Sequence, residues 1–166
     1  RLTTGVGNGN LPSSSVNSYV FDKDDELWIG TSDGLVVCFT PSNAMNGNSI
    51  DAQALLVEEN GIVQKVLSGE NILAIAIDGA NRKWVGTSEG GLFLLSSDGL
   101  ETLAHYTQSN SPLLSNRINS LAIQPLTGEV FIGTSQGLIS YRSDAINPFN
   151  DFSNIQVFPN PYEPKD

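Results

Sequence analysis

The sequence predicts an all-β protein built from repeated units, and three observations support this prediction. One motif occurs three times: an aromatic residue, a β-branched residue, Gly-Thr-Ser, any residue and Gly, at 28–34, 84–90 and 131–137. Each copy follows a largely apolar run of strand-forming residues and a polar turn. The only trace of helical periodicity lies in Ala52–Glu59.

Each repeat is expected to form four short strands. The first strand is largely apolar, as expected where both of its faces are covered. A turn then leads into the second strand, which ends at Gly-Thr-Ser, and the following Gly permits a tight hairpin into the third. We expect first strands at Val16–Phe21, Ile72–Ile77 and Ile118–Ile123, and fourth strands at Ile62–Leu67 and Glu101–Thr107.

The spacing of the repeats is typical of β-propeller blades. The motif glycines Gly30, Gly86 and Gly133 lie 56 and 47 residues apart, close to the period of about 40–50 residues in propellers. Closed propellers have about four to eight blades, so three four-stranded blades cannot form a ring. We therefore expect a fragment of a larger propeller of about six to eight blades, or copies that associate through their exposed blade faces.

Composition shifts divide the chain into five parts. A Gly-rich stretch precedes the first blade, a polar Asn- and Gly-rich insertion interrupts it, and a Pro- and Asn-rich stretch follows the last. The expected parts are the end of a preceding blade (1–10), a blade with an insertion at 41–61 (11–68), a second blade (69–110), a partial last blade (111–146) and a linker into a C-terminal domain (147–166).

Charge and hydropathy exclude several functions. The net charge of −10 argues against nucleic acid and anionic membrane surfaces, which require basic residues. No apolar stretch is long enough to span a membrane. The chain starts at Arg1 without a methionine or the features of a signal peptide, which suggests a removed leader or a piece of a longer chain.

No residue pattern predicts catalysis, a metal or a cofactor. Cys38 is the only cysteine, so it forms no intrachain disulfide, and its apolar strand context predicts burial. The single histidine, His105, lies in a strand without a nucleophile motif around it. No pair of acids stands out as the carboxylates of a glycosidase.

Two further features have a structural and a functional interpretation. The acidic segment Asp22–Glu26 has carboxylates spaced for a cation but lacks the glycine and distal glutamate of a calcium loop, so we expect a hairpin turn, with Asp22 and Asp78 as turn formers. Trp28 and Trp84 could stack on sugars, but their fixed place in the repeat favours the core between blades.

A binding face, if present, is predicted on one rim. First and third strands start on the same side of the propeller, so the loops that precede them gather there. The alternative, in which Asn and Ser side chains only cap turns, stays open. The candidate ligand-binding residues are Asn17, Ser32, Asp33, Glu89, Arg117, Asn119 and Gln136.

The segment 16–35 resembles the two-component-regulator propeller repeat, and the likeness extends over Leu11 to Tyr141. The third copy departs from the pattern at Phe131 and at Gln124-Pro125. This repeat is abundant in the periplasmic sensor regions of Bacteroidetes hybrid histidine kinases. The resemblance therefore implies an exported protein, and one function it suggests is a sensor for an oligosaccharide.

The end of the chain resembles a second family. Val157–Pro164 is similar to the opening of type IX secretion C-terminal domains, and propellers followed by such a domain resemble PorZ-like proteins. That resemblance implies a surface or periplasmic protein that recognises lipopolysaccharide-type glycan, or a partner protein, in connection with type IX secretion. A set of blades that only docks other protein domains is a third interpretation.

Overall fold

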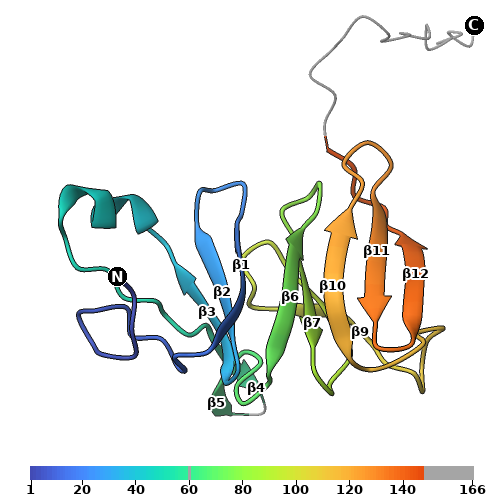
Figure 1. The fold of residues 1–166 in the computed structure, drawn as a ribbon, viewed down its shortest axis with the longest axis horizontal. Coiled ribbons are helices and arrows are strands. Elements are labelled where there is room, and N and C mark those ends of the chain that lie inside the picture. Colours follow the sequence, from blue (N-terminus) through green and yellow to red (C-terminus); the bar gives the residue numbers. More distant parts are fainter. Residues whose placement is uncertain (60, 148–166) are drawn as a thin grey trace, which may run out of the picture.

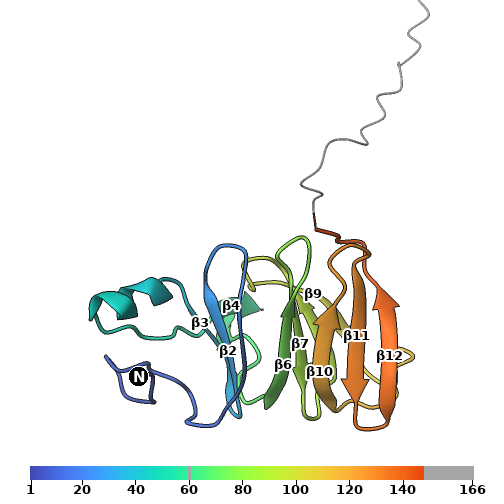
Figure 2. The same cartoon turned by 45° about the horizontal axis from the view of Figure 1, so that its top comes forward.

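The computed structural model describes residues 1–59 and 61–147 and confirms an all-β fold (Figure 1). Three antiparallel sheets stand side by side as successive blades (Figures 1 and 2). Their first strands, β1 (Val16–Phe21), β6 (Ile72–Ile77) and β10 (Ile118–Ile123), have the predicted bounds and lie next to one another. No helix in this part of the chain is long and apolar enough to cross a membrane.

The remaining strands follow the expected order within each blade. The first blade adds β2 (Leu27–Thr31) and β3 (Gly34–Cys38), the second adds β7 (Lys83–Thr87), β8 (Leu92–Leu95) and β9 (Thr102–Tyr106), and the third adds β11 (Glu129–Thr134) and β12 (Gly137–Arg142). The second blade therefore has four strands, and its fourth, β9, lies inside the predicted range Glu101–Thr107.

The fourth strand of the first blade was predicted at the wrong place. Ile62–Leu67 does not pair with β3; instead β5 (Ile62–Lys65) pairs with β4 (Leu56–Glu59) in a separate hairpin. Gln53 takes the fourth position, because its main chain exchanges hydrogen bonds of 2.9 and 2.8 Å with Val37 of β3. The same pairings show that Ala52–Glu59, whose pattern suggested a helix, does not form one. The helix of the insertion is a 3-10 helix, η1 (Pro41–Asn46).

The N-terminal segment covers the face of the first blade that points away from the second. Residues 1–4, expected to end a strand of a preceding blade, form none. Instead, the Asp51 carboxylate accepts hydrogen bonds from the amides of Gly7 and Gly9 at 2.8 and 2.9 Å. Leu2 and Leu11 then pack on the cluster that includes the buried Cys38, as the sequence predicted for this thiol. The Val157–Pro164 motif and all of the expected linker after Asn147 lie outside the described residues.

Each motif tryptophan fills the interface to the next blade, as predicted. Trp28 belongs to the apolar cluster between the first and second blades, and Trp84 to the cluster between the second and third. Both side chains are 0% exposed. Because aromatic side chains bury large areas, these two residues contribute strongly to blade packing.

In the first two blades, the neighbouring blade requires the glycine of the Gly-Thr-Ser element. A Cβ atom on Gly30 would lie 2.5 Å from Cγ2 of Ile72, and one on Gly86 would lie 2.5 Å from Cγ2 of Ile118. Each isoleucine is the first residue of the next inner strand. Glycine in a strand often marks such a close approach.

An aspartate links the turn of each of the first two blades to its tryptophan. Oδ1 of Asp22 accepts hydrogen bonds from the amides of Asp24 and Glu26, and Oδ2 accepts one from Nε1 of Trp28, all at 3.0 Å. Asp78 makes the same three contacts in the second blade, with its tryptophan at 3.3 Å. The role of both aspartates as turn formers is confirmed. In the third blade, Gln124 stands in place of the aspartate and Phe131 in place of the tryptophan.

A buried ion pair joins the first two blades. Nζ of Lys83 lies 2.8 Å from Oδ2 of Asp22 and 4.7 Å from the centre of the Trp28 ring. It also donates to the main-chain oxygens of Asn81, at 2.8 Å, and Ser97. Burial alone would raise the pKa of Asp22, but hydrogen bonds from Lys83, the Glu26 amide and Trp28 outweigh it and keep the pKa below its usual value.

Candidate functional site

In all three blades, the loop before the first strand meets the hairpin between the second and third strands, as predicted. These loops and hairpins lie along one rim, the lower edge in Figure 1. The amide of Ser32 donates to the oxygen of Ser15 at 3.0 Å, and that of Ser88 to Asn71 at 2.9 Å. In the third blade the Ser135 amide donates to the oxygen of Arg117 at 3.2 Å. These bonds tie each hairpin to the loop before the inner strand, so the rim is a continuous surface on a rigid scaffold.

Asn17 has a structural partner on the next blade. Its Nδ2 donates to Oδ1 of Asn71 and to the oxygen of Ile72, both at 2.9 Å. The register of β1 against β2 shifts between Val16 and Ser18, and this bulge presents Asn17 to the neighbouring loop. Asn17 therefore positions the second blade, and its amide donor is not free for a ligand.

The other predicted residues lie along the rim and differ in exposure and in hydrogen-bond partners. Ser32 is held by a 2.8 Å hydrogen bond between its hydroxyl and that of Ser13. Arg117 and Asn119 are exposed and paired, with Nε of the arginine donating to Oδ1 of the asparagine at 3.1 Å. Asp33, Glu89 and Gln136 are exposed at the tips of the three hairpins. The rim thus offers two carboxylates, two amides and one guanidinium to solvent.

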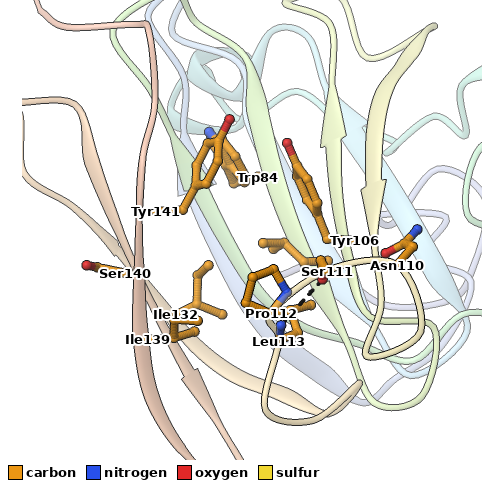
Figure 3. A pocket seen from close by; sticks show the side chains of 11 residues that line it. Trp84, Tyr106, Asn110, Ser111, Pro112, Leu113, Ile132, Ile139, Ser140 and Tyr141 are labelled. Carbon is orange, nitrogen blue, oxygen red and sulfur yellow. Dashed lines mark hydrogen bonds between the residues drawn. The ribbon is translucent and has the colours of Figure 1, made fainter.

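A second feature, an apolar cleft between the second and third blades, was not predicted (Figure 3). The cleft has a volume of about 220 Å³ and contains the rings of Trp84, Tyr106 and Tyr141. The Trp84 and Tyr106 rings are stacked with centroids 6.2 Å apart, and Tyr141 lies 5.8 Å from Trp84 and 5.7 Å from Tyr106. Burial and a hydrogen bond with Tyr141 raise the pKa of Tyr106 to about 12, so its hydroxyl stays protonated at neutral pH.

Most polar atoms around this cleft already have partners within the chain. The hydroxyl of Ser111 donates to the oxygen of Thr107 at 2.6 Å, and Nδ2 of Asn110 donates to that of His105 at 2.9 Å. Nε1 of Trp84 donates to Asp78. The Tyr106 hydroxyl also has a partner, because it is hydrogen-bonded with Tyr141. The cleft is therefore suited to an apolar group.

The single histidine makes structural contacts in the described part of the chain. Nε2 of His105 lies 2.6 Å from the oxygen of Gly90, and its ring stacks on Phe93 with centroids 4.0 Å apart. Burial raises the pKa of the Cys38 thiol, which disfavours a thiolate. The Asp22 carboxylate is bound by three N–H donors and by the ammonium group of Lys83. In residues 1–59 and 61–147 no group of three His, Cys, Asp or Glu side chains could hold a metal ion.

Comparison with known proteins agrees with this geometry. The family model of the two component regulator propeller matches residues 10–33. This chain contains a two component regulator propeller repeat. The matched residues of the repeat run from the loop before β1 to the hairpin after β2, and so include the acidic turn and Trp28. No curated protein matches the sequence.

Solved structures that resemble these propeller repeats include a surface protein and an extracellular domain. PorZ of Porphyromonas gingivalis, an essential bacterial surface component of the type-IX secretion system, is 32% identical over 76% of this chain, with a TM-score of 0.74. The extracellular domain of the hybrid two component system BT3049 from B. thetaiotaomicron is 23% identical over 78% of it, with a TM-score of 0.59. The chain spans only 17% of the first protein and 16% of the second.

A gluconolactonase structure also matches, at 12% identity over 79% of this chain and 39% of its own length, with a TM-score of 0.55. At the identities of this structure and of BT3049, the likeness concerns the fold alone. The chain is therefore a set of β-propeller blades related in fold to PorZ and to the extracellular domains of two component systems.

Proposed function

We propose that this chain is a non-catalytic recognition module of an exported bacterial surface protein of the PorZ type. The observation that carries this proposal is the likeness to PorZ, at 32% identity and a TM-score of 0.74. The contacts of His105 and Cys38 support the absence of catalysis, because both groups have structural roles in the described part of the chain. The ligand is a cell-surface glycan of the lipopolysaccharide type, in connection with type IX secretion.

The rim of hairpins and inner-strand loops is the proposed glycan site. Arg117 offers a cation to phosphate or carboxylate groups of the glycan, and Asn119 offers an amide to its hydroxyl groups. The carboxylates of Asp33 and Glu89 accept hydrogen bonds from sugar hydroxyls. Because the hairpins are tied to their loops, little conformational entropy is lost when these side chains bind.

The proposal is tested by isothermal titration of the chain with lipopolysaccharide and capsular glycan from its source organism. We expect saturable binding that weakens at least about tenfold, or about 1.4 kcal/mol, in Arg117→Gln. Arg142→Gln is the matched control, because Arg142 is an exposed arginine at the far end of β12, away from the rim. Equal affinities of the two variants, or no binding by the folded chain, would contradict the proposal.

A second candidate is a periplasmic sensor propeller of a hybrid two component histidine kinase that binds an oligosaccharide. The match of residues 10–33 to the regulator propeller family favours it. The gene sequence after Asp166 separates the two candidates. A membrane span followed by a kinase supports the sensor, and a β-sandwich domain supports the PorZ-type protein.

A further inference from the structure

Three asparagines in the sequence stand directly before a glycine, in the steps 8–9, 46–47 and 60–61. Glycine has no Cβ and restricts the main chain less than any other residue, so its amide nitrogen can approach the side-chain carbon of the asparagine before it. Residue 60 lies outside the described residues, and the inference concerns the first two steps.

An asparagine in such a step can lose its side-chain amide without an enzyme. The main-chain nitrogen of the glycine gives up its proton and forms a bond to Cγ of the asparagine. The bond from Cγ to Nδ2 breaks, ammonia leaves, and a five-membered succinimide ring remains. Water then opens the ring at either carbonyl carbon, which gives aspartate or isoaspartate. No electrons are transferred, so the rate depends on how freely the glycine nitrogen can lose its proton and reach Cγ.

The step from Asn8 to Gly9 is held on both sides of its peptide bond. The buried N–H of Gly9 donates to Oδ1 of Asp51 at 2.9 Å. The main-chain oxygen of Gly9 accepts a bond from the Ala52 amide at 2.7 Å, and that of Asn8 accepts one from the Thr3 amide. Hydrogen bonds to an ionised group are stronger than neutral ones. The negative charge of Asp51 also opposes loss of the Gly9 proton.

The step from Asn46 to Gly47 has none of these constraints. Both residues are exposed, and a Cβ on Gly47 would have open space around it. The N–H of Gly47 donates only to neutral main-chain oxygens, those of Ala44, at 3.2 Å, and Asn43, at the end of η1. A 3-10 helix has poor hydrogen-bond geometry, and exposed turns open at a low cost in free energy. The Gly47 nitrogen is therefore released often.

We propose that Asn46 is a site of spontaneous deamidation in the folded chain, and that Asp51 protects Asn8 from the same reaction. Both asparagines are followed by glycine, so the difference between them comes from the fold. The product at residue 46 carries a carboxylate in place of a neutral amide, and isoaspartate also lengthens the main chain at the end of η1. This modification concerns the chemical lifetime of the chain and goes beyond the proposed function.

The test incubates the full chain at mildly alkaline pH and follows each asparagine by mass spectrometry of its peptides. In the native chain we expect Asn46 to deamidate at least about tenfold faster than Asn8. In concentrated urea the two rates should agree within about twofold, because unfolding removes the contacts of Gly9. Equal rates in the native chain, or a faster reaction at Asn8, would overturn the proposal.

Asp51→Ala tests the protection directly. Loss of the carboxylate should speed deamidation of Asn8 at least about fivefold and leave the rate at Asn46 unchanged. Glu58→Ala is the matched control, because it removes an exposed carboxylate of β4 and should change neither rate. An unchanged rate at Asn8 in folded Asp51→Ala would refute the role of Asp51.

A second measurement decides the question if Asp51→Ala fails to fold. Amide exchange of the unmodified chain should be at least about tenfold slower at Gly9 than at Gly47, because only the first N–H is buried and bonded to a carboxylate. Equal exchange at the two glycines would overturn the proposal.

Discussion

The contact between Gly86 and Ile118 gives the sharpest test of blade packing. A Cβ at residue 86 would lie 2.5 Å from Cγ2 and 2.7 Å from Cβ of Ile118, well inside van der Waals contact. Overpacking of this kind typically costs about 1–3 kcal/mol. We expect Gly86→Ala to destabilise the chain by about 2 kcal/mol, which at a urea m-value of about 2 kcal/mol/M lowers the midpoint by about 1 M.

Gly133→Ala is the matched control for this experiment. Gly133 has the same place in the repeat, but the nearest atoms to a Cβ there belong to Ser120 of its own blade, and the closest of them is the side-chain hydroxyl. A serine hydroxyl can rotate away, so the cost should stay below about 1 kcal/mol. Urea titration followed by tryptophan fluorescence measures both variants. Equal midpoints for Gly86→Ala and Gly133→Ala would refute the argument that the neighbouring blade selects this glycine.

Three further substitutions test other contacts by the same unfolding assay. Asp22→Asn should cost about 3 kcal/mol, because it leaves the charge of Lys83 buried without its partner. Since the folded pKa of Asp22 lies below its ordinary value of 3.8, the native chain should lose stability as the pH falls through that range, and the variant should lose less; parallel pH profiles would contradict this. Ser18→Ala should leave stability unchanged or raise it by up to about 1 kcal/mol, because the buried Ser18 hydroxyl has no hydrogen-bond partner among the described residues; a clear loss would show that it has one. Asn17→Ala should cost about 1–2 kcal/mol through two lost hydrogen bonds but change glycan affinity less than twofold, and a large loss of affinity would assign it to the ligand site.

The inner strands could be predicted because the repeat aligns them. The motif occurs three times, so the position of the inner strand relative to it could be compared in three copies. All three inner strands have the expected bounds. The turn role of Asp22 and the burial of Trp28 also followed from their fixed places in the repeat.

The fourth strand of the first blade could not be predicted from local pattern. The apolar residues near Leu55 and those near Ile62 are equally compatible with a strand beside β3. The choice is made by main-chain pairing of Gln53 and by the hairpin that the second segment forms instead. Periodicity reports which residues are buried, but it carries no information on which strands pair.

The candidate site was predictable only in part. The alternation of strand directions correctly gathered the loops on one rim. It could not show that Asn17 donates to Asn71 and Ile72, because that contact depends on how two blades pack. The aromatic cleft gave no sequence signal, since Tyr106 and Tyr141 belong to different blades and meet only in the folded chain.

The most direct test of recognition at the rim is a map of amide chemical shifts during titration with the surface glycan. The account predicts that shifts concentrate at the three hairpin tips, Asp33, Glu89 and Gln136, and at Arg117 and Asn119. The turns at the opposite ends of the strands should stay unchanged. Shifts confined to those opposite turns, or none at saturating glycan, would contradict a glycan-binding rim.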